Sequence, residues 1–144
     1  MTLPDRLPWW LKLVNPVITR LNRRGLAIGT QHILTVPGRT SGKLYTTPVS
    51  LLTLDGQRYI VSLPWTGWVK NARVSGWGFL ERGRRRERVR LVELPPAERA
   101  RVVREFPVQV PHGVSFFRLP PDPAVFEQAA PQLTAFRIDP DVRV

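Results

Sequence analysis

The stretch that decides the fold runs from Leu44 to Leu63 and reads LYTTPVSLLTLDGQRYIVSL. Its two halves, Leu44–Leu54 and Gln57–Leu63, are rich in the branched and aromatic residues that favour strands. Between them stands an Asp-Gly pair, one of the better short-range signals for a tight turn between antiparallel strands. The stretch therefore predicts a β-hairpin.

Further strands and short helices are predicted on both sides of this hairpin. The additional strands are Gln31–Val36, Trp77–Glu81, Arg85–Leu94 and Leu133–Ile138. The helices are Trp9–Arg23, Thr66–Ser75, Pro95–Glu105 and Ala124–Ala130, whereas the proline-punctuated segment Pro107–Pro123 is expected to be loop. About six mostly antiparallel strands with short flanking helices indicate a mainly β (α+β) fold. We expect a small barrel, with residues 1–144 in a single domain.

Composition excludes several classes of chemistry. The chain has 144 residues, a net charge of +11 and no cysteine, which excludes disulfides, cysteine-ligated metals and thiol nucleophiles. Its two histidines, His32 and His112, argue against a histidine-rich metal site, so no metal is expected. No secretory signal or spanning segment is visible, which indicates a cytoplasmic protein. The positive charge leaves three anionic partners open: nucleic acid, a membrane surface or a phosphorylated small molecule.

The sharpest local feature is a short basic turn with the sequence GRTSGK. Its glycines permit a tight backbone whose N–H groups can point at one anion, and its cations and hydroxyls add charge and donors. It differs from the P-loop of nucleotide hydrolases, because three residues separate its glycines and a strand follows. The turn therefore predicts a phosphate site, with a solvated basic turn as the alternative. Its residues are Gly38, Arg39, Thr40, Ser41, Gly42 and Lys43.

A second cluster leads from a strand into a helix and reads SLPWTGWVKN, from Ser62 to Asn71. Backbone donors and Ser62 could face a planar ligand there, with Trp65 as a flat apolar wall and Lys70 or Asn71 at the polar edge. For Trp68, at the start of the helix, a place in the core is the stronger interpretation, because an aromatic residue there is more often buried than in contact with a cofactor.

Two runs together resemble the deazaflavin (coenzyme F420)-dependent nitroreductase family: LTVPGRTSGKLYTTPV (Leu34–Val49) and WVKNAR (Trp68–Arg73). The resemblance extends to about Leu94. It implies a split β-barrel like that of flavin-binding pyridoxamine oxidase-like proteins. It also implies hydride transfer from reduced coenzyme F420 to a small acceptor, such as a quinone, nitro or enone compound.

The resemblance also implies positions for the cofactor. The turn residues Gly38, Arg39, Ser41, Gly42 and Lys43 would hold its phosphate and anionic tail. The remaining contacts would come from the strand beside the deazaflavin ring, from the segment along the ring and from the helix start: Thr47, Pro48, Val49; Ser62, Leu63, Pro64, Trp65; and Trp68, Lys70, Asn71.

The sequence departs from the family in its C-terminal part. Members that reduce nitroimidazoles have tyrosines there, whereas both tyrosines of this chain lie earlier. The C-terminal third, which includes the variable segment 107–131, offers Phe106, His112, Phe116, Phe117 and Phe126 instead. The acceptor is therefore not specified. Because hydride transfer is the cofactor's own chemistry, no catalytic triad is expected. Ser62 and His112 are the candidate proton donors.

Other interpretations remain open. A related barrel could bind flavin mononucleotide (FMN), haem or a fatty acid without this activity. The arginine run from Arg82 to Arg90 suggests a nucleic-acid-binding module, although it lacks interleaved aromatics and is also typical of a solvated strand. An amphipathic N-terminal helix in residues 1–25, with Trp9 and Trp10 beside a basic face, could contact a membrane surface. An exposed edge strand would permit a homodimer.

Overall fold

The computed structural model describes residues 31–141, which contain seven strands in one antiparallel sheet. Its strand order is β2-β1-β5-β6-β7-β4-β3. The strands are β1 (Gln31–Pro37), β2 (Leu44–Ser50), β3 (Leu52–Leu54), β4 (Gln57–Ser62), β5 (Trp77–Arg82), β6 (Arg85–Glu93) and β7 (Thr134–Pro140). The helices are α2 (Gly67–Ser75), α3 (Pro96–Gln109), α4 (Val114–Phe117) and α5 (Pro123–Ala129), with short 3₁₀ turns η1 (Pro111–Gly113) and η2 (Ala130–Gln132). The helix expected over Trp9–Arg23 lies outside these residues.

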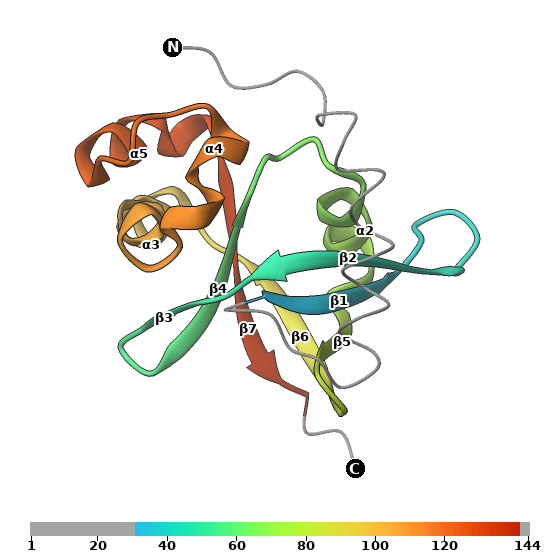
Figure 1. Ribbon diagram of the computed structural model, residues 1–144. Helices are drawn as coiled ribbons and strands as arrows, with labels where there is room; N and C mark the ends of the chain where they lie inside the picture. The colour runs from blue at the N-terminus through green and yellow to red at the C-terminus, as the bar shows by residue number, and fades with distance from the viewer. Residues whose placement is uncertain (1–30, 142–144) are drawn as a thin grey trace.

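The sheet curls into a half-barrel, as the sequence predicted, and its edge strand β2 approaches β4 (Figure 1). The run Leu44–Leu54 was expected as one strand, but it is two, because its halves pair with different partners. The first half pairs with β1 and the second with β4, so the strand breaks at Leu51. Seven strands therefore replace the expected six.

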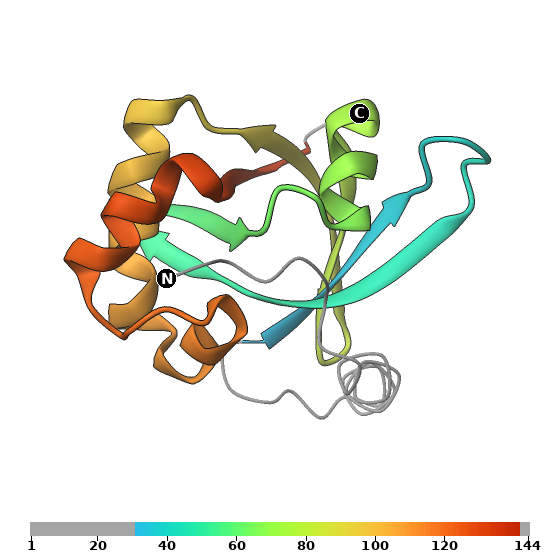
Figure 2. The ribbon, with the colours of Figure 1, turned by 90° about the horizontal axis from the view of Figure 1, so that it is seen from above.

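Strands β4 and β7 are buried on both faces, which gives the protein two cores. Ile60 and Phe136 point into the barrel, where they join Val69 and Ala72 of α2. Tyr59 and Val61, as their neighbours on β4, point the other way, toward α3, α4 and α5. This split follows from the two-residue period of a strand. Figure 2 shows α3 and α5 side by side on one part of the sheet, with α2 over another.

The prediction of a loop over Pro107–Pro123 was wrong for residues 107–117, whereas residues 118–122 form a loop as expected. Helix α3 continues through Pro107 to Gln109, and α4 follows after one 3₁₀ turn. A proline inside a helix costs about 3 kcal/mol. That cost is offset here because each fully buried aromatic side chain contributes about 1.5–3 kcal/mol, and three phenylalanines bury their rings together. Phe106 lies 5.0 Å from Phe117 and 5.6 Å from Phe126, measured between ring centroids.

Candidate functional site

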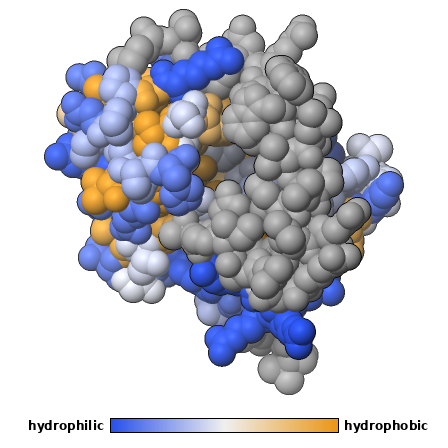
Figure 3. All heavy atoms as spheres, in the orientation of Figure 1, coloured by the Kyte–Doolittle hydropathy of each residue, from blue (hydrophilic) through white to orange (hydrophobic). Residues whose placement is uncertain are grey.

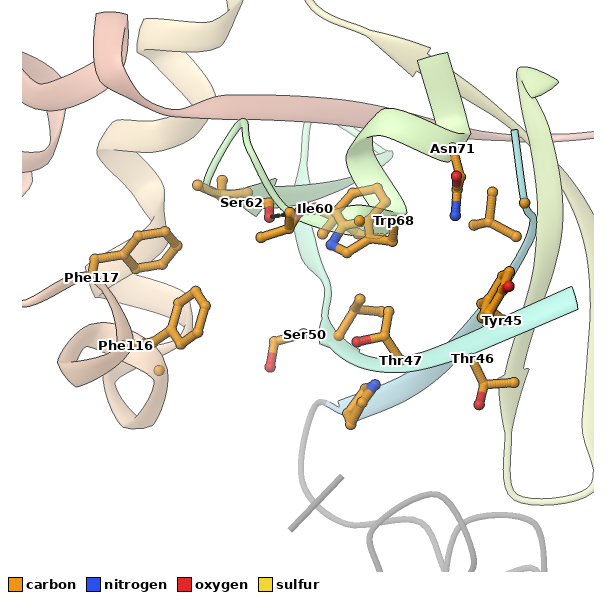
Figure 4. Close-up of a pocket in the computed structure, with 18 of the residues that line it drawn as sticks. Tyr45, Thr46, Thr47, Ser50, Ile60, Ser62, Trp68, Asn71, Phe116 and Phe117 are labelled. Carbon is orange, nitrogen blue, oxygen red and sulfur yellow. Dashed lines mark hydrogen bonds between the residues drawn. The ribbon is translucent and has the colours of Figure 1, made fainter. Parts of the chain in front are cut away.

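One cavity of about 650 Å³ opens where β2 and β4 approach each other without pairing. Its walls come from the β1–β2 turn, from β2, from the end of β4, from the start of α2, and from η1 and α4. Figure 4 shows Phe116 and Phe117 at one end of this cavity and Tyr45 and Asn71 at the other, with Ser62, Ile60 and Trp68 between them. The cavity is thus elongated, and its two ends differ in chemistry.

The basic turn after β1 is closed by its own backbone. The Gly38 N–H donates to the Lys43 carbonyl oxygen at 2.7 Å, and the Gly42 N–H donates to the Gly38 carbonyl oxygen at 3.0 Å. Gly42 has a φ of 77°, which a residue with a side chain adopts only at a cost. The ring of Tyr45 packs against Gly38, since a Cβ there would lie 2.7 Å from Tyr45 Cε2. The turn is therefore held in one shape at the mouth of the cavity.

Helix α2 forms the adjoining wall and is tied to the turn. Asn71, only 6% exposed, accepts two hydrogen bonds at Oδ1 from Arg39: one from the backbone N–H at 3.0 Å and one from Nη1 at 2.8 Å. The helix begins after Thr66, whose side chain does not cap it, and its first turn holds no acidic residue. The first N–H groups of a helix lack intrahelical acceptors, so this end of the cavity is rich in donors.

Two hydroxyls line the middle of the cavity. Ser62 Oγ and Thr66 Oγ1 each lie 3.2 Å from the Leu63 carbonyl oxygen, to which each donates, and 3.4 Å from each other. With their hydrogens directed at that carbonyl, their oxygens are left as acceptors. Trp68, beside them, packs its ring 5.2 Å from Phe136 of β7 and also borders the cavity.

The far end of the cavity is aromatic. Phe116 and Phe117 of α4 line it together with Phe106 of α3, and His112 of η1 lies beside them. Phe116 stacks edge to face on Phe117 at 5.2 Å, so both rings have fixed orientations. This end therefore offers apolar aromatic surface rather than charge.

No aspartate or glutamate lines the cavity within the described part of the chain, and Arg39 supplies positive charge. Two carboxylates on the sheet are paired with arginines outside the cavity. Arg73 binds Glu93 through two hydrogen bonds, which lower the pKa of Glu93 despite partial burial. Arg58 likewise lowers the pKa of Glu87. The cavity is therefore suited to an anionic ligand.

The structure brings most of the predicted site residues together. The cavity is lined by Gly38, Arg39, Thr40, Ser41, Thr47, Pro48, Val49, Ser62, Trp68, Asn71 and His112. The remaining candidates, Gly42, Lys43, Leu63, Pro64, Trp65 and Lys70, do not line it. Leu63 is fully buried and Trp65 packs against the helical core.

Sequence reasoning missed several lining residues. These are Val36, Tyr45, Thr46, Ser50, Ile60, Val61, Thr66, Gly67, Gly113 and Ser115. Ile60 could have been found, because it lies two residues before Ser62 and so on the same face of β4. Gly113 and Ser115 could not, since their segment was expected to be loop.

The arginine run lies away from the cavity, on the β5–β6 hairpin. Hydrophilic residues gather at the lower end of the molecule in Figure 3, where Figure 1 places the hairpin tip. The arginine run contains no aromatic residue, but two of its arginines stack on aromatic rings of the neighbouring strand β5. The guanidinium carbon lies 3.9 Å from the Phe79 ring centroid in Arg86 and 4.0 Å from the Trp77 ring centroid in Arg88. Arg88 also pairs with Asp141 at 2.7 Å, so part of the charge is neutralised within the sheet.

Comparison with known proteins identifies the fold. No protein-family model and no curated protein matches the chain. Solved structures do. The protein Atu2129 of Agrobacterium tumefaciens, of unknown function, has a TM-score of 0.60 and 16% identity over 97% of this chain and 57% of its own, so this chain spans little more than half of its length.

Two further structures share the fold. An F420-H2 dependent reductase has a TM-score of 0.56 and 15% identity, covering 76% of this chain and 94% of its own. An FAD-binding protein from Mesorhizobium loti has a TM-score of 0.55 and 17% identity, covering 88% of each chain. At such identities the likeness shows the fold alone. The chain has a split β-barrel fold that it shares with flavin- and deazaflavin-dependent proteins.

Two observations bear on membranes and metals. Between residues 31 and 141, no helix combines the length and hydropathy needed to cross a bilayer. The membrane-contact prediction falls on residues 1–25, outside that range. Within the same described range, no three His, Asp or Glu side chains cluster in a way that could hold a metal ion.

Proposed function

We propose that this chain is a coenzyme F420-dependent oxidoreductase that reduces a small apolar acceptor. The observation that carries the proposal is the elongated cavity, with a carboxylate-free, donor-rich end at Arg39 and Asn71 and an aromatic end at Phe116 and Phe117. The volume of about 650 Å³ falls within the range of roughly 300–1,000 Å³ that is usual for ligand pockets. The F420-H2 dependent reductase of the same fold supports the proposal.

The residues present fit a deazaflavin cofactor. The turn Gly38–Lys43 brings the guanidinium of Arg39 and the hydroxyls of Thr40 and Ser41 to the cavity, where they suit a phosphate or a carboxylate. The acceptor oxygens of Ser62 and Thr66 suit an N–H group on the edge of a ring system. Trp68 and Ile60 offer apolar surface to the faces of such a ring. When bound, the cofactor would supply hydride-transfer chemistry.

The chain's own residues would then bind and orient the cofactor and the acceptor and exclude water from them. Phe116, held edge to face against the buried Phe117, offers an aromatic ring against which a planar acceptor can pack at this end of the cavity. His112 lies at that end and remains our candidate for delivering a proton to the reduced acceptor; Ser62, whose hydrogen is directed to Leu63, is the weaker of the two. The acceptor is proposed only as a class: a quinone, nitro or enone compound.

The test is a titration of the purified protein with oxidised coenzyme F420, followed by its fluorescence, in parallel with FMN. Saturable binding of F420, and oxidation of reduced F420 that depends on an added quinone, nitroaromatic or enone, would support the proposal. Absence of saturable F420 binding at low salt would refute it. Binding of FMN alone would favour a flavin-binding split barrel, as the FAD-binding neighbour suggests.

Three partner predictions accompany this proposal. The acceptor is a small molecule, residues 1–25 contact a membrane surface peripherally from the cytoplasm, and an edge strand mediates a homodimer. The edge strand β2 has β1 as its only hydrogen-bonded neighbour in the described sheet, and its first residues, Leu44 and Tyr45, are half exposed. Analytical ultracentrifugation and vesicle co-sedimentation would test these predictions separately.

A further inference from the structure

A second cleft, of about 500 Å³, shares no lining residue with the cavity described above. Its walls come from the end of β6, the start of α3, the last turn of α2, η2 and the start of β7. Arg73, which lines it, lies two residues after Asn71 on α2, so the two side chains point to different sides of that helix. The proposed function makes no use of this cleft.

The charges that line the cleft do not cancel. Among residues 31–141 its one carboxylate is that of Glu93, which accepts hydrogen bonds from Nε and Nη2 of Arg73 at 2.9 and 2.8 Å and from the hydroxyl of Thr134. These hydrogen bonds lower the pKa of Glu93 against its partial burial, and the nearby charge of Arg99 acts in the same direction. Glu93 is therefore matched by Arg73. The second arginine of the cleft, Arg99, has no ion pair within the described range.

The guanidinium of Arg99 is only partly satisfied. Its one hydrogen bond to the described part of the chain runs from Nη1 to the Leu133 carbonyl oxygen at 3.3 Å. Its Nε is buried and has no acceptor, whereas Nη2 also lacks an acceptor but is not buried, so it is open to the cleft. A charge that is desolvated on one side without a counter-ion is costly unless its open side is compensated. The partial burial therefore points to an anion on the Nη2 side.

The other lining residues limit what kind of anion fits. Pro64, Pro95 and Pro131 line the cleft, and because they carry no N–H and have a fixed φ, they add rigid apolar walls but no donors. The volume lies within the range of roughly 300–1,000 Å³ that is usual for small-molecule sites, and it exceeds what a bare ion needs. Glu93 disfavours a second negative charge on the ligand. The cleft therefore suits a small molecule that carries one phosphate or carboxylate group.

We propose that this cleft is a second ligand site, in which Arg99 binds the phosphate or carboxylate group of a small molecule. An anionic oxygen accepts from Nη2 of Arg99, on the side of the guanidinium that the protein leaves open. The proline rings pack against the apolar part of the molecule. The site does not depend on the proposed function, because it shares no residue with the cofactor cavity.

The experiment follows the arginine Nε–H signals in ¹⁵N spectra of the wild-type protein during titration with inorganic phosphate, and separately with acetate, at constant ionic strength. Burial of Arg99 Nε slows exchange of its proton with water, and the signal is assigned by its loss in Arg99→Met. We expect a saturable shift of this signal, with a Kd on the order of 1 mM for phosphate. A response to acetate would support the site and extend it to carboxylates. A signal that moves with neither anion would overturn the inference.

Matched variants distinguish a local contact from overall charge. Arg99→Met keeps an aliphatic stem and removes the guanidinium. Arg104→Met makes the same change on the same helix, at a half-exposed position outside the cleft. With the Arg73 Nε–H signal as the reporter, Arg99→Met should bind phosphate about tenfold more weakly or worse, because a charge-assisted hydrogen bond is lost. Arg104→Met should change Kd by less than about twofold, and equal losses for the two variants would overturn the inference.

Two more variants keep the test decisive if Arg99→Met does not fold. Glu93→Gln removes the like charge beside the site and should tighten phosphate binding roughly two- to fivefold, whereas weaker binding than in the wild type would overturn the inference. Arg39→Ala changes the other cavity and should leave the Arg99 response intact. A response abolished by Arg39→Ala would belong to the cofactor cavity and would also overturn the inference. Failure of F420 to bind, with the Arg99 response intact, would refute the proposed function and support the second site.

Discussion

Replacement of Arg39 by alanine should separate ligand binding from stability. In the folded protein its side chain makes one hydrogen bond, from Nη1 to Asn71 Oδ1 at 2.8 Å. Removal of this bond does not orphan the Asn71 oxygen, because the Arg39 backbone N–H still donates to it at 3.0 Å. We therefore expect a loss below about 1 kcal/mol in the free energy of unfolding. That corresponds to a fall in Tm of only about 2–5 °C.

The effect on affinity should be much larger. A hydrogen bond between a guanidinium and a phosphate or carboxylate contributes about 1.5–3 kcal/mol, which is roughly a 10- to 100-fold change in Kd. The assay is fluorescence titration with oxidised coenzyme F420, with thermal unfolding measured on the same samples. The matched control is Arg84→Ala, which removes the same charge from the exposed hairpin tip, outside the cavity.

The control decides between local contact and overall charge. At physiological salt, charges farther apart than about 8 Å are largely screened, so Arg84→Ala should change Kd by less than about twofold. The reasoning fails if Arg84→Ala weakens binding as much as Arg39→Ala does. It also fails if Arg39→Ala lowers Tm steeply while leaving Kd unchanged.

Three further predictions concern packing and pH. Gly38→Ala should lower the free energy of unfolding by less than about 1 kcal/mol, because the half-exposed Tyr45 ring can move away from the new Cβ. Gly78→Ala should lower it by about 1–3 kcal/mol or more, because its Cβ would lie 2.5 Å from the Thr35 carbonyl oxygen. Urea unfolding measures both, and equal losses for the two variants would contradict this reasoning. Phe117→Ala should destabilise by about 3–5 kcal/mol, since the ring is buried and contacts three other phenylalanines. A change under about 1 kcal/mol in urea unfolding would contradict the packing. Arg73 lowers the pKa of Glu93 in the folded state, so this pair stabilises the fold above the unfolded pKa of about 4.3 and the stabilisation is lost as pH falls through the lower folded value. The difference in unfolding free energy between wild type and Glu93→Gln should accordingly shrink between neutral and acidic pH, and a difference that grew on acidification would reverse the assignment.

Local turn chemistry explains why the hairpin could be predicted. Asp55 and Gly56 have φ values of 53° and 76°, the left-handed pair that a two-residue hairpin turn requires. Helix α2 also ends as the sequence indicates, at Gly76 with a φ of 73°. Both features depend on the conformational preferences of one or two residues, so a single sequence contains enough information to find them.

Distant packing explains what could not be predicted. The break at Leu51 exists because two halves of one apolar run pair with strands on opposite sides of the sheet. The helix through Pro107 is stabilised by aromatic residues up to 20 positions away. Neither the strands that pair with the two halves nor the distant phenylalanines can be identified from a short stretch of sequence. In such a stretch, proline is correctly interpreted as a residue that ends a helix.

The same distinction applies to the candidate site. The turn at Gly38–Lys43 and the start of α2 were identified from motifs and from a family resemblance. The bond between Arg39 and Asn71 was not, because it depends on how β1 and α2 pack together. The phenylalanines of the aromatic end were named from the sequence, but their arrangement around the cavity was not predicted. The reason is that the backbone segment that positions them was expected to be an irregular loop.

The placement of β7 has a consequence for how the protein is made. The walls of the cavity around residues 38–71 emerge from the ribosome before β7, the partner of β4, which follows all the other strands of the described sheet in the chain: Arg58 lies opposite Ile138. Until then, Ile60 and Val61 line an open strand edge, and Trp68 lacks the Phe136 ring on which it packs. Pairings this far apart in sequence form slowly. A nascent chain therefore carries the basic turn and the start of α2 before β7 has paired with β4, and that pairing completes the sheet that supports the cavity.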